Sequence, residues 1–324
     1  MPPPVRRRLV ACLLLAAGAL ALAATAFADN GGITPLEPNS PNAGRINDAY
    51  LLVLGITGVV FVLVEATLIA FIIRYRRGKR PRDEEGEQVH GATTVETAWT
   101  IAPVLLLTAV VAFVFYKLPG IENTPPASAG DRTNIGVEGH QFYWLFRRPD
   151  GSSSINELEV PVGRVVTLDL TSPDVIHSWW VPEFGGKIDT IPGKVNHTWF
   201  KPERPGTFAI RCAEFCGVQH AAMRGVVRVL PEGVEPRKLS RMELGKQVVD
   251  GVCATCHGDR LQGGVGPKIA GSALFQDERG MRDVIRNGIR TMPAIGKTWN
   301  AQMLNATIAY LKSTTSAQGG TSGG

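Results

Sequence analysis

Residues 212–223 read CAEFCGVQHAAM and place two cysteines, a histidine and a methionine in one short segment. Another histidine, His177, lies upstream in the stretch VIHSWW at 175–180. Thiolate, imidazole and thioether are soft ligands, which suit copper better than magnesium or calcium. A single-copper electron-transfer site uses one cysteine, whereas a second cysteine lets two thiolates bridge two copper ions. The sequence therefore predicts a binuclear copper site with the ligands His177, Cys212, Cys216, His220 and Met223.

Two alternatives for this segment are a disulfide and a zinc site. A Cys212–Cys216 disulfide is conceivable outside the cytoplasm, but it would leave the histidines and the methionine as coincidences. Zinc is bound by cysteine, histidine and carboxylate and rarely recruits methionine. Copper is therefore the favoured metal.

The residues around this segment, 118–232, have the pattern of an all-β domain. The stretch VVTLDL at 165–170 alternates apolar and polar side chains, which is typical of a half-buried strand. Short runs rich in aromatic and β-branched residues recur between Pro and Gly turns, at 141–146, 175–181, 195–200, 207–211 and 224–229. Many short strands at regular spacing predict a sandwich or barrel.

A second constellation follows a linker at 233–237, where residues 253–257 read CATCH. Cys-x-x-Cys-His is the attachment motif for haem c, in which Cys253 and Cys256 form thioethers and His257 binds the iron. Met292 is the candidate sixth ligand, because a Met/His pair leaves no open coordination site and suits electron transfer. Met281 competes with it but lies in a charged, helix-like stretch. We expect a small all-α domain over 238–313, with helices near 238–252 and 300–311, and a disordered tail over 314–324.

Three apolar segments precede the β domain. The first, 1–28, carries Arg6 to Arg8 before an apolar stretch and ends in Ala-Phe-Ala, which is the pattern of a cleaved signal peptide. An uncleaved first membrane helix is the alternative. The other two are each about 20 residues long, enough to span a bilayer. We expect an extracytoplasmic segment at 29–48 and a transmembrane hairpin at 49–117, with helices at 50–73 and 97–116.

The loop of that hairpin gives its orientation. Residues 74–89 carry six basic side chains, and such runs beside membrane helices mark the cytoplasmic side. The large C-terminal part is therefore expected outside. Glu65 lies within the first hairpin helix, where a carboxylate in contact with lipid is costly. It predicts packing against other membrane subunits, with snorkelling toward the interface as the alternative.

The cysteine count and the charge agree with this organisation. The chain has five cysteines and a formal net charge of +5. Two cysteines are assigned to copper and two to haem, and Cys12 lies in the signal segment. Residues 118–237 carry a net charge of −2 and residues 238–324 a net charge of +5. The basic character therefore does not indicate nucleic acid, and it predicts that complementary charges orient the two domains.

At this point the chain resembles subunit II of haem–copper cytochrome c oxidases, fused to a class I cytochrome c domain as in the caa type. The resemblance is carried by CAEFCGVQHAAM and by VETAWTIAP at 95–103, GHQFYW at 139–144 and the stretch 170–200. It implies a multi-domain fold: an N-terminal transmembrane α-hairpin, a cupredoxin-like Greek-key barrel and a small all-α cytochrome c domain. It also implies a bacterial cell membrane location, multi-pass, with both cofactor domains on the extracytoplasmic side.

The resemblance implies further roles for single residues. The backbone carbonyl of Glu214 would complete one copper, and the Glu214 carboxylate would bind a magnesium ion shared with subunit I. Glu96 would guard a proton-uptake path into subunit I. The electron-entry aromatic residues would be Phe142, Tyr143 and Trp144. Phe142 departs from the family, which has tryptophan there, and this places the usual docking point for a soluble cytochrome c in question.

The implied function is electron entry into a terminal oxidase. Electrons would pass from haem c to the copper pair and on to the oxygen-reducing site of subunit I, so this chain holds no oxygen-activating site itself. Expected partners are subunit I, subunit III and a donor cytochrome or reductase complex. The main alternative is a free-standing membrane-anchored electron-transfer protein. A quinol oxidase subunit would lack the copper ligands, and nitrous oxide reductase would need a large catalytic domain.

Overall fold

The computed structural model describes residues 35–76, 88 and 90–318. The predicted signal peptide, most of the basic loop and the end of the tail lie outside these residues. The described chain forms two compact units, one made mainly of residues 44–121 and one of residues 38–43 and 122–318.

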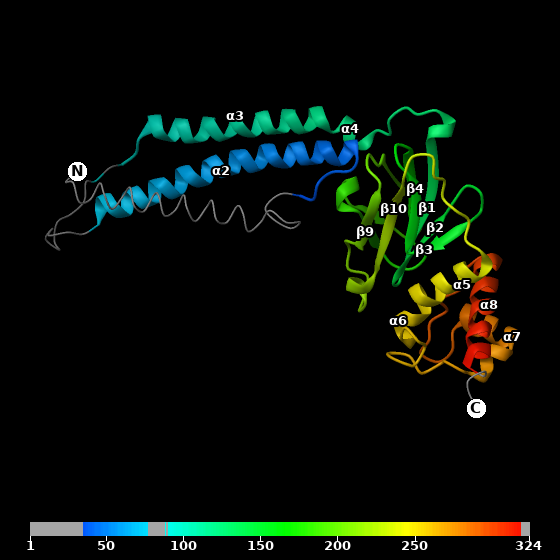
Figure 1. The fold of residues 1–324 in the computed structure, drawn as a ribbon. Helices are drawn as coiled ribbons and strands as arrows, with labels where there is room; N and C mark the ends of the chain where they lie inside the picture. The colour runs from blue at the N-terminus through cyan, green and yellow to red at the C-terminus, as the bar shows by residue number, and fades with distance from the viewer. Residues whose placement is uncertain (1–34, 77–87, 89, 319–324) are drawn as a thin grey trace, which may run out of the picture. The chain divides into compact units, whose positions relative to one another are not determined.

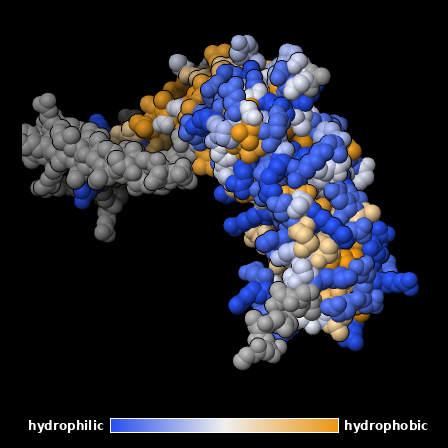
Figure 2. Space-filling model, turned by 45° about the vertical axis from the view of Figure 1, so that its right-hand side comes forward, coloured by the Kyte–Doolittle hydropathy of each residue, from blue (hydrophilic) through white to orange (hydrophobic). Residues whose placement is uncertain are grey.

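The first unit contains two long apolar helices, which Figure 1 shows lying side by side in blue and cyan: α2 Pro41–Tyr75 and α3 Thr93–Lys117. Both are long and apolar enough to cross a membrane. Each exceeds its predicted length, because polar residues at the ends also adopt helical geometry; α2 begins at Pro41, within the segment predicted to precede the hairpin. The visible surface of the helices is mostly hydrophobic (Figure 2).

The second unit begins with two five-stranded sheets. The first has the strand order β3-β2-β1-β5-β8 and the second has the order β4-β10-β9-β6-β7. The strands of the first sheet are β1 Arg132–His140, β2 Tyr143–Arg147, β3 Ser153–Ile155, β5 Val165–Thr171 and β8 Asn196–Phe200. Those of the second are β4 Glu157–Pro161, β6 His177–Trp180, β7 Ile188–Thr190, β9 Gly206–Cys212 and β10 Arg224–Leu230.

One hydrophobic core fills the space between the sheets. Side chains of both sheets contribute, among them Val137, Leu168, Trp179, Ile210 and Val227. The alternation expected for residues 165–170 is confirmed, because Val166, Leu168 and Leu170 are fully buried. The all-β, cupredoxin-like prediction holds for this region.

A helical region follows and surrounds a second hydrophobic core. Its main elements are α5 Arg241–Val248, the π-helical turn η4 Val249–Cys253, α6 Ala254–His257, the short 3-10 turn η5 Ala273–Gln276, α7 Glu278–Asn287 and α8 Ala301–Gln318. The first helix begins at Arg241 rather than 238, because Ser240 and Glu243 form a reciprocal capping box at its start. The last helix continues to Gln318, so the predicted start of the tail at 314 is wrong: Ala317 and Gln318 still favour helix.

The two cores of the second unit meet across a shared boundary. Tyr143, Leu145 and Ile155 of the first sheet belong to the same buried cluster as Leu244, Val248 and Trp299 of the helical region. The indole Nε1 of Trp299 donates a 2.8 Å hydrogen bond to the hydroxyl of Tyr143. The Gln247 amide oxygen accepts from the backbone N–H of Ile155 at 3.1 Å. The helical region is therefore packed onto the β domain and not only tethered to it.

Residues 38–43, which we call the N-terminal strap, also belong to the β domain. Asn39, Ser40 and Asn42 are almost fully buried. The Asn39 carboxamide oxygen accepts from the backbone N–H of Arg204 at 2.8 Å, and the Asn42 amide donates to the Trp199 carbonyl at 2.8 Å. No local sequence pattern indicates these contacts, because their partners lie about 160 residues further along the chain.

Candidate metal centres

The structure gathers all five predicted copper ligands. His177 lies on β6, Cys212 ends β9, and Met223 directly precedes β10, with Cys216 and His220 in the loop between them. Strand β6 pairs with β9 so that Trp179 lies opposite Cys212. This pairing brings the distant histidine to the loop.

The candidate ligand atoms lie close enough to one another to bind the same metal ions. The Sγ atoms of Cys212 and Cys216 are 3.8 Å apart, and Cys216 Sγ lies 3.6 Å from His220 Nδ1 and 3.8 Å from Met223 Sδ. His177 Nδ1 lies 3.1 Å from Met223 Sδ. Both cysteines are free thiols, and their separation is far beyond the roughly 2.0 Å of a disulfide bond. The donor set is soft, so the residues fit a pair of copper ions.

Asp174 orients His177 and was missed by the sequence analysis. Its Oδ1 lies 2.8 Å from His177 Nε2, which leaves Nδ1 directed toward Met223. Burial would raise the pKa of Asp174, but hydrogen bonds from His177 and from the backbone N–H groups of Gln141 and Val175 lower it to about 2. Histidine ligands of metals commonly have such a carboxylate partner. Its position three residues before His177 was the available signal.

The two thiols differ in their electrostatic surroundings. Burial raises the pKa of Cys212, but hydrogen bonds from His177 and from the Ser178 backbone overcome this effect and lower the pKa to about 6. Burial and the neighbouring Cys212 raise the pKa of Cys216 to about 12. Two adjacent thiolates therefore need cations to be stable together, which bridging copper ions would supply.

The backbone carbonyl and the side-chain carboxylate of Glu214 lie in different surroundings. Its backbone carbonyl lies 3.2 Å from Cys212 Sγ, beside the copper candidates. Its carboxylate is exposed and lies 3.8 Å from Lys187 Nζ. The carbonyl thus lies where the resemblance expects a ligand, whereas the carboxylate has a lysine as its neighbour within this chain.

The haem candidates lie on one helical run formed by η4 and α6. Cys253 and His257 are buried and Cys256 is half-buried. His257 Nδ1 lies 2.7 Å from the carbonyl oxygen of Pro267, which leaves Nε2 as the nitrogen for iron. A Cβ on Gly266 would lie 2.9 Å from the His257 ring, so glycine is needed there. The residues fit covalent haem c, with two thiols and one oriented imidazole.

The two candidate methionines for the sixth position differ in environment. Met281 lies on α7 with 2% exposure and belongs to the hydrophobic core. Met292 is half-buried in a turn, where Ile289 and Met292 form an isolated bridge, and it is not part of that core. Met281 is therefore a core residue, and Met292 stays the candidate ligand.

The three aromatic residues of GHQFYW differ in their surroundings. The Trp144 ring is buried and packs edge-on against His177, with centroids 6.2 Å apart. Tyr143 is buried beneath the helical region. Phe142 is half-buried, and a Cβ on Gly217 would lie 3.1 Å from its ring. Two of the three predicted entry residues are thus covered by this chain itself.

Glu96 lies in the first turn of α3 and is exposed in this chain. Its carboxylate accepts from the backbone N–H of Ala92 at 3.1 Å. This contact satisfies one of the free N–H groups at the helix start. Glu65 is also exposed, among apolar neighbours on α2.

Comparisons with known proteins agree with this geometry. Residues 152–230 match the family model described as the periplasmic domain of cytochrome c oxidase subunit II, and residues 32–118 match the model of its transmembrane domain. Residues 240–311 match the model described as cytochrome c oxidase, cbb3-type, subunit III. The fold and site thus define a membrane-anchored, cupredoxin-like subunit joined to a cytochrome c domain.

Relatives from other organisms are also similar to this chain. Cytochrome c oxidase subunit 2 of Alkalihalophilus pseudofirmus is 39% identical over 201 residues, covering 59% of this chain and 56% of that protein. Cytochrome c oxidase subunit 2 of Cereibacter sphaeroides is 31% identical over 275 residues, covering 69% of this chain and 88% of that protein. The chain belongs to the cytochrome c oxidase subunit 2 family.

A solved structure is also similar. It is the crystal structure of the periplasmic domain of subunit II of cytochrome oxidase from Bradyrhizobium japonicum, which is 35% identical. The alignment covers 34% of this chain and 89% of that chain, with a TM-score of 0.32.

Proposed function

We propose that this subunit is the electron inlet of a terminal oxidase and carries its own electron donor domain. The observation that supports this most is that one compact unit contains both the soft donor group around Cys212 and Cys216 and a Cys-x-x-Cys-His motif. Electrons would enter at haem c, pass to the copper pair and leave for the oxygen-reducing site on subunit I, in support of aerobic respiration and proton translocation.

Each group would be held by residues already described. Cys212 and Cys216 would hold the copper pair, and Cys253, Cys256, His257 and Met292 would hold the haem. His177 and Met223 would complete one copper, with His220 and the Glu214 carbonyl completing the other. When bound, both groups supply one-electron redox chemistry without bond breaking. The protein's part is to orient the ligands, as Asp174 does for His177, and to exclude water, since His177 and Met223 are buried.

The membrane arrangement follows from the strap and the two helices. Residues 38–43 and the β domain form one unit, so the chain before α2 and the chain after α3 lie on the same side of a membrane. Two crossings satisfy this condition. The basic loop places that side outside the cytoplasm, in a bacterial cell membrane.

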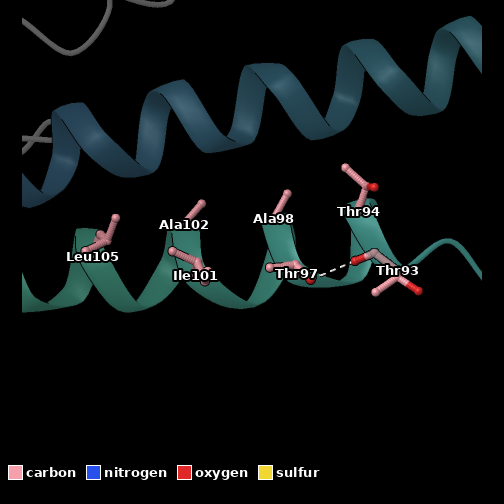
Figure 3. A pocket seen from close by; sticks show the side chains of 7 residues that line it. All are labelled: Thr93, Thr94, Thr97, Ala98, Ile101, Ala102 and Leu105. Atoms are coloured by element: carbon pink, nitrogen blue, oxygen red, sulfur yellow. Dashed lines mark hydrogen bonds between the residues drawn. The ribbon is translucent and has the colours of Figure 1, made fainter.

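Exposed polar and small residues on the helices support a membrane partner. Glu65 is exposed in the part of the chain that the structure describes, and a carboxylate facing lipid is costly. A shallow pocket on α3 is lined mainly by small side chains (Figure 3): Thr93, Thr94, Thr97, Ala98, Ile101, Ala102 and Leu105. Small residues allow close helix packing. We infer that these surfaces pack against subunit I, with subunit III as a further partner. Glu96 at the proton-path entrance and a magnesium ion at Glu214 would belong to the boundary with subunit I.

A spectroscopic experiment tests the cofactors. The full chain, purified in detergent after expression with copper and haem maturation, should show a mixed-valence binuclear copper signal and low-spin haem c. Cys216→Ser should remove the binuclear copper signal and leave the haem, whereas Cys256→Ala should reduce covalent haem attachment and leave the copper. A single-copper spectrum of the unaltered chain would contradict the proposal.

A second experiment separates an oxidase subunit from a free-standing electron-transfer protein. Purification of the tagged full chain from native membranes should also recover a haem a protein with oxygen-reducing activity. Recovery of the chain alone, with both of its spectra intact, would favour the free-standing alternative.

A further inference from the structure

The two ligand motifs contact each other directly across the boundary between the domains. The side-chain amide of Gln219 donates a 3.3 Å hydrogen bond to the backbone carbonyl of Thr255. Gln219 directly precedes the copper candidate His220, and Thr255 directly precedes the haem candidate Cys256. The bond therefore joins residues that are each one position away from a cofactor ligand.

Both ends of this contact are fixed by their own local structure. The Gln219 carbonyl accepts from the Ala222 backbone N–H at 2.9 Å and so holds the turn that carries His220. Thr255 lies in the short helix α6, whose Ala254, Cys256 and His257 carbonyls accept from Gly258, Gly266 and Gly263. Carbonyls at a helix end need partners from elsewhere, and the Thr255 carbonyl finds its partner on the copper loop.

Other cross-domain contacts, away from the ligand motifs, also hold the surfaces in place. Among them are the Trp299–Tyr143 bond in the shared core and the bond from the Ile155 N–H to Gln247. Gly251 adds a close approach, since a Cβ there would lie 2.9 Å from Ile155. Gln219 is distinct from these contacts because it alone, among the described cross-domain hydrogen bonds, connects the two ligand motifs.

We propose that Gln219 is a positioning residue for electron transfer: it holds the haem motif against the copper loop and supplies the hydrogen-bonded link between them. The proposal rests on the proposed function. In that step one electron leaves ferrous iron, which becomes ferric, and the copper pair is reduced by one electron. No proton moves and no bond breaks, so the rate depends on how the two sites are positioned.

The test compares two leucine variants of the full, cofactor-loaded chain in detergent. Gln219→Leu removes the link, and Gln247→Leu removes the amide contacts to Ile155 and Glu157, which lie away from the ligand motifs. Pulse radiolysis measures the haem-to-copper rate without oxygen or an external donor. We expect Gln219→Leu to slow it by about tenfold or more, since a misplacement of ~1 Å can cost up to about 100-fold in a step that depends on positioning. Gln247→Leu should change it less than twofold, and Gln219→Lys, which restores a donor, should recover much of the rate.

Amide hydrogen exchange supplies a readout that does not depend on the reaction. Gln219→Leu should increase exchange in residues 249–258, whereas Gln247→Leu should increase it near 153–157. Midpoint potentials and the copper spectrum should stay at their unaltered values, which shows that the ligands themselves are intact. An unchanged rate, or unchanged exchange at 249–258, would overturn the proposal for Gln219. Absence of haem-to-copper transfer in the unaltered chain would instead contradict the proposed function.

Discussion

Glu138 is a half-buried carboxylate whose charge is balanced by two neighbours in the first sheet. Arg147 donates to it at 2.6 Å, and His140 Nε2 lies 3.1 Å from its other oxygen. The His140 ring in turn stacks on Tyr143, with centroids 4.6 Å apart. Burial would raise the pKa of Glu138, but the hydrogen bonds from His140 and Arg147 lower it to about 2. The network thus stabilises the ionised form beneath the domain boundary.

This network predicts a specific acid sensitivity. The pKa of Glu138 is lower in the folded chain than the usual 4.5. The ionised carboxylate therefore contributes its full share of the folding stability above pH 4.5, and this share is lost as the pH falls toward 2. We expect Glu138→Gln to cost on the order of 2 kcal/mol at pH 7 and much less near pH 3. Denaturant unfolding followed by tryptophan fluorescence at both pH values measures this. The exposed Glu232→Gln serves as the control, and equal losses at both pH values would contradict the account.

The hydroxyl of Tyr143 supports a second prediction at this scale. Tyr143→Phe leaves the buried indole N–H of Trp299 without its acceptor, which typically costs about 1–3 kcal/mol. Trp299→Phe removes the donor as well, so the double variant should be less destabilised than the two single effects added together. A double-mutant cycle from thermal unfolding measures this coupling, and strict additivity would show that the bond contributes nothing.

Among the elements, the crossing of α5 and α8 depends on one glycine. A Cβ at Gly245 would lie 2.2 Å from the Ala306 carbonyl oxygen, which is backbone and cannot move away cheaply. The helices therefore approach each other more closely than any larger residue permits. The helical propensity of α5 alone would favour alanine there, so packing overrides propensity at this position.

We expect Gly245→Ala to destabilise the cytochrome c domain by about 1–3 kcal/mol, the usual cost of overpacking. Haem-region unfolding in denaturant, followed by the haem absorbance, measures it. Gly136→Ala is the matched control, because a Cβ there would meet only ordinary contact, at 3.5 Å from the Arg147 Cβ. Equal stability of the two variants would show that the helices adjust without cost.

Local patterns in the sequence predicted the elements and the ligands, because these depend on neighbouring residues. The spacing of Cys212, Cys216 and Met223 and the CATCH motif predicted both candidate centres, and alternation predicted strand β5. The bond between Tyr143 and Trp299 joins residues 156 positions apart, and no local pattern indicates it. A domain face that is exposed to solvent and one that is covered by a second domain can carry similar residues. Sequence alone therefore does not show which face is covered.

For the whole molecule, the net charges predicted that electrostatics would orient the two domains. The structure adds a buried apolar boundary around Tyr143, Leu145 and Ile155, with ion pairs such as Lys238–Asp150 at the exposed edge. Exposed ion pairs contribute little and weaken in salt, whereas apolar burial does not depend on charge. We therefore expect the domains to stay together in high salt.

Cleavage of the linker tests this expectation. A protease site inserted after Gly233 allows the full chain in detergent to be cut, and gel filtration then shows whether the haem fragment remains bound. We expect it to stay bound at 1 M salt, where the screening length is about 3 Å. Ile155→Asp, which places a charge in the boundary, should release it. Release of the unaltered fragment by salt alone would show that charge governs the docking.

The N-terminal strap also determines the order in which the protein can mature. Asn39 and Ser40 precede α2 and Asn42 lies in its first turn, yet the groups they bond, from Trp199 to Arg204, follow some 160 residues later. The strap is thus synthesised long before the residues that it contacts. The β domain can fold completely only after both helices have been inserted, with the strap on the outer face of the membrane. We therefore expect copper loading, which would need the closed domain, to be a late step of biogenesis that depends on correct insertion of both helices.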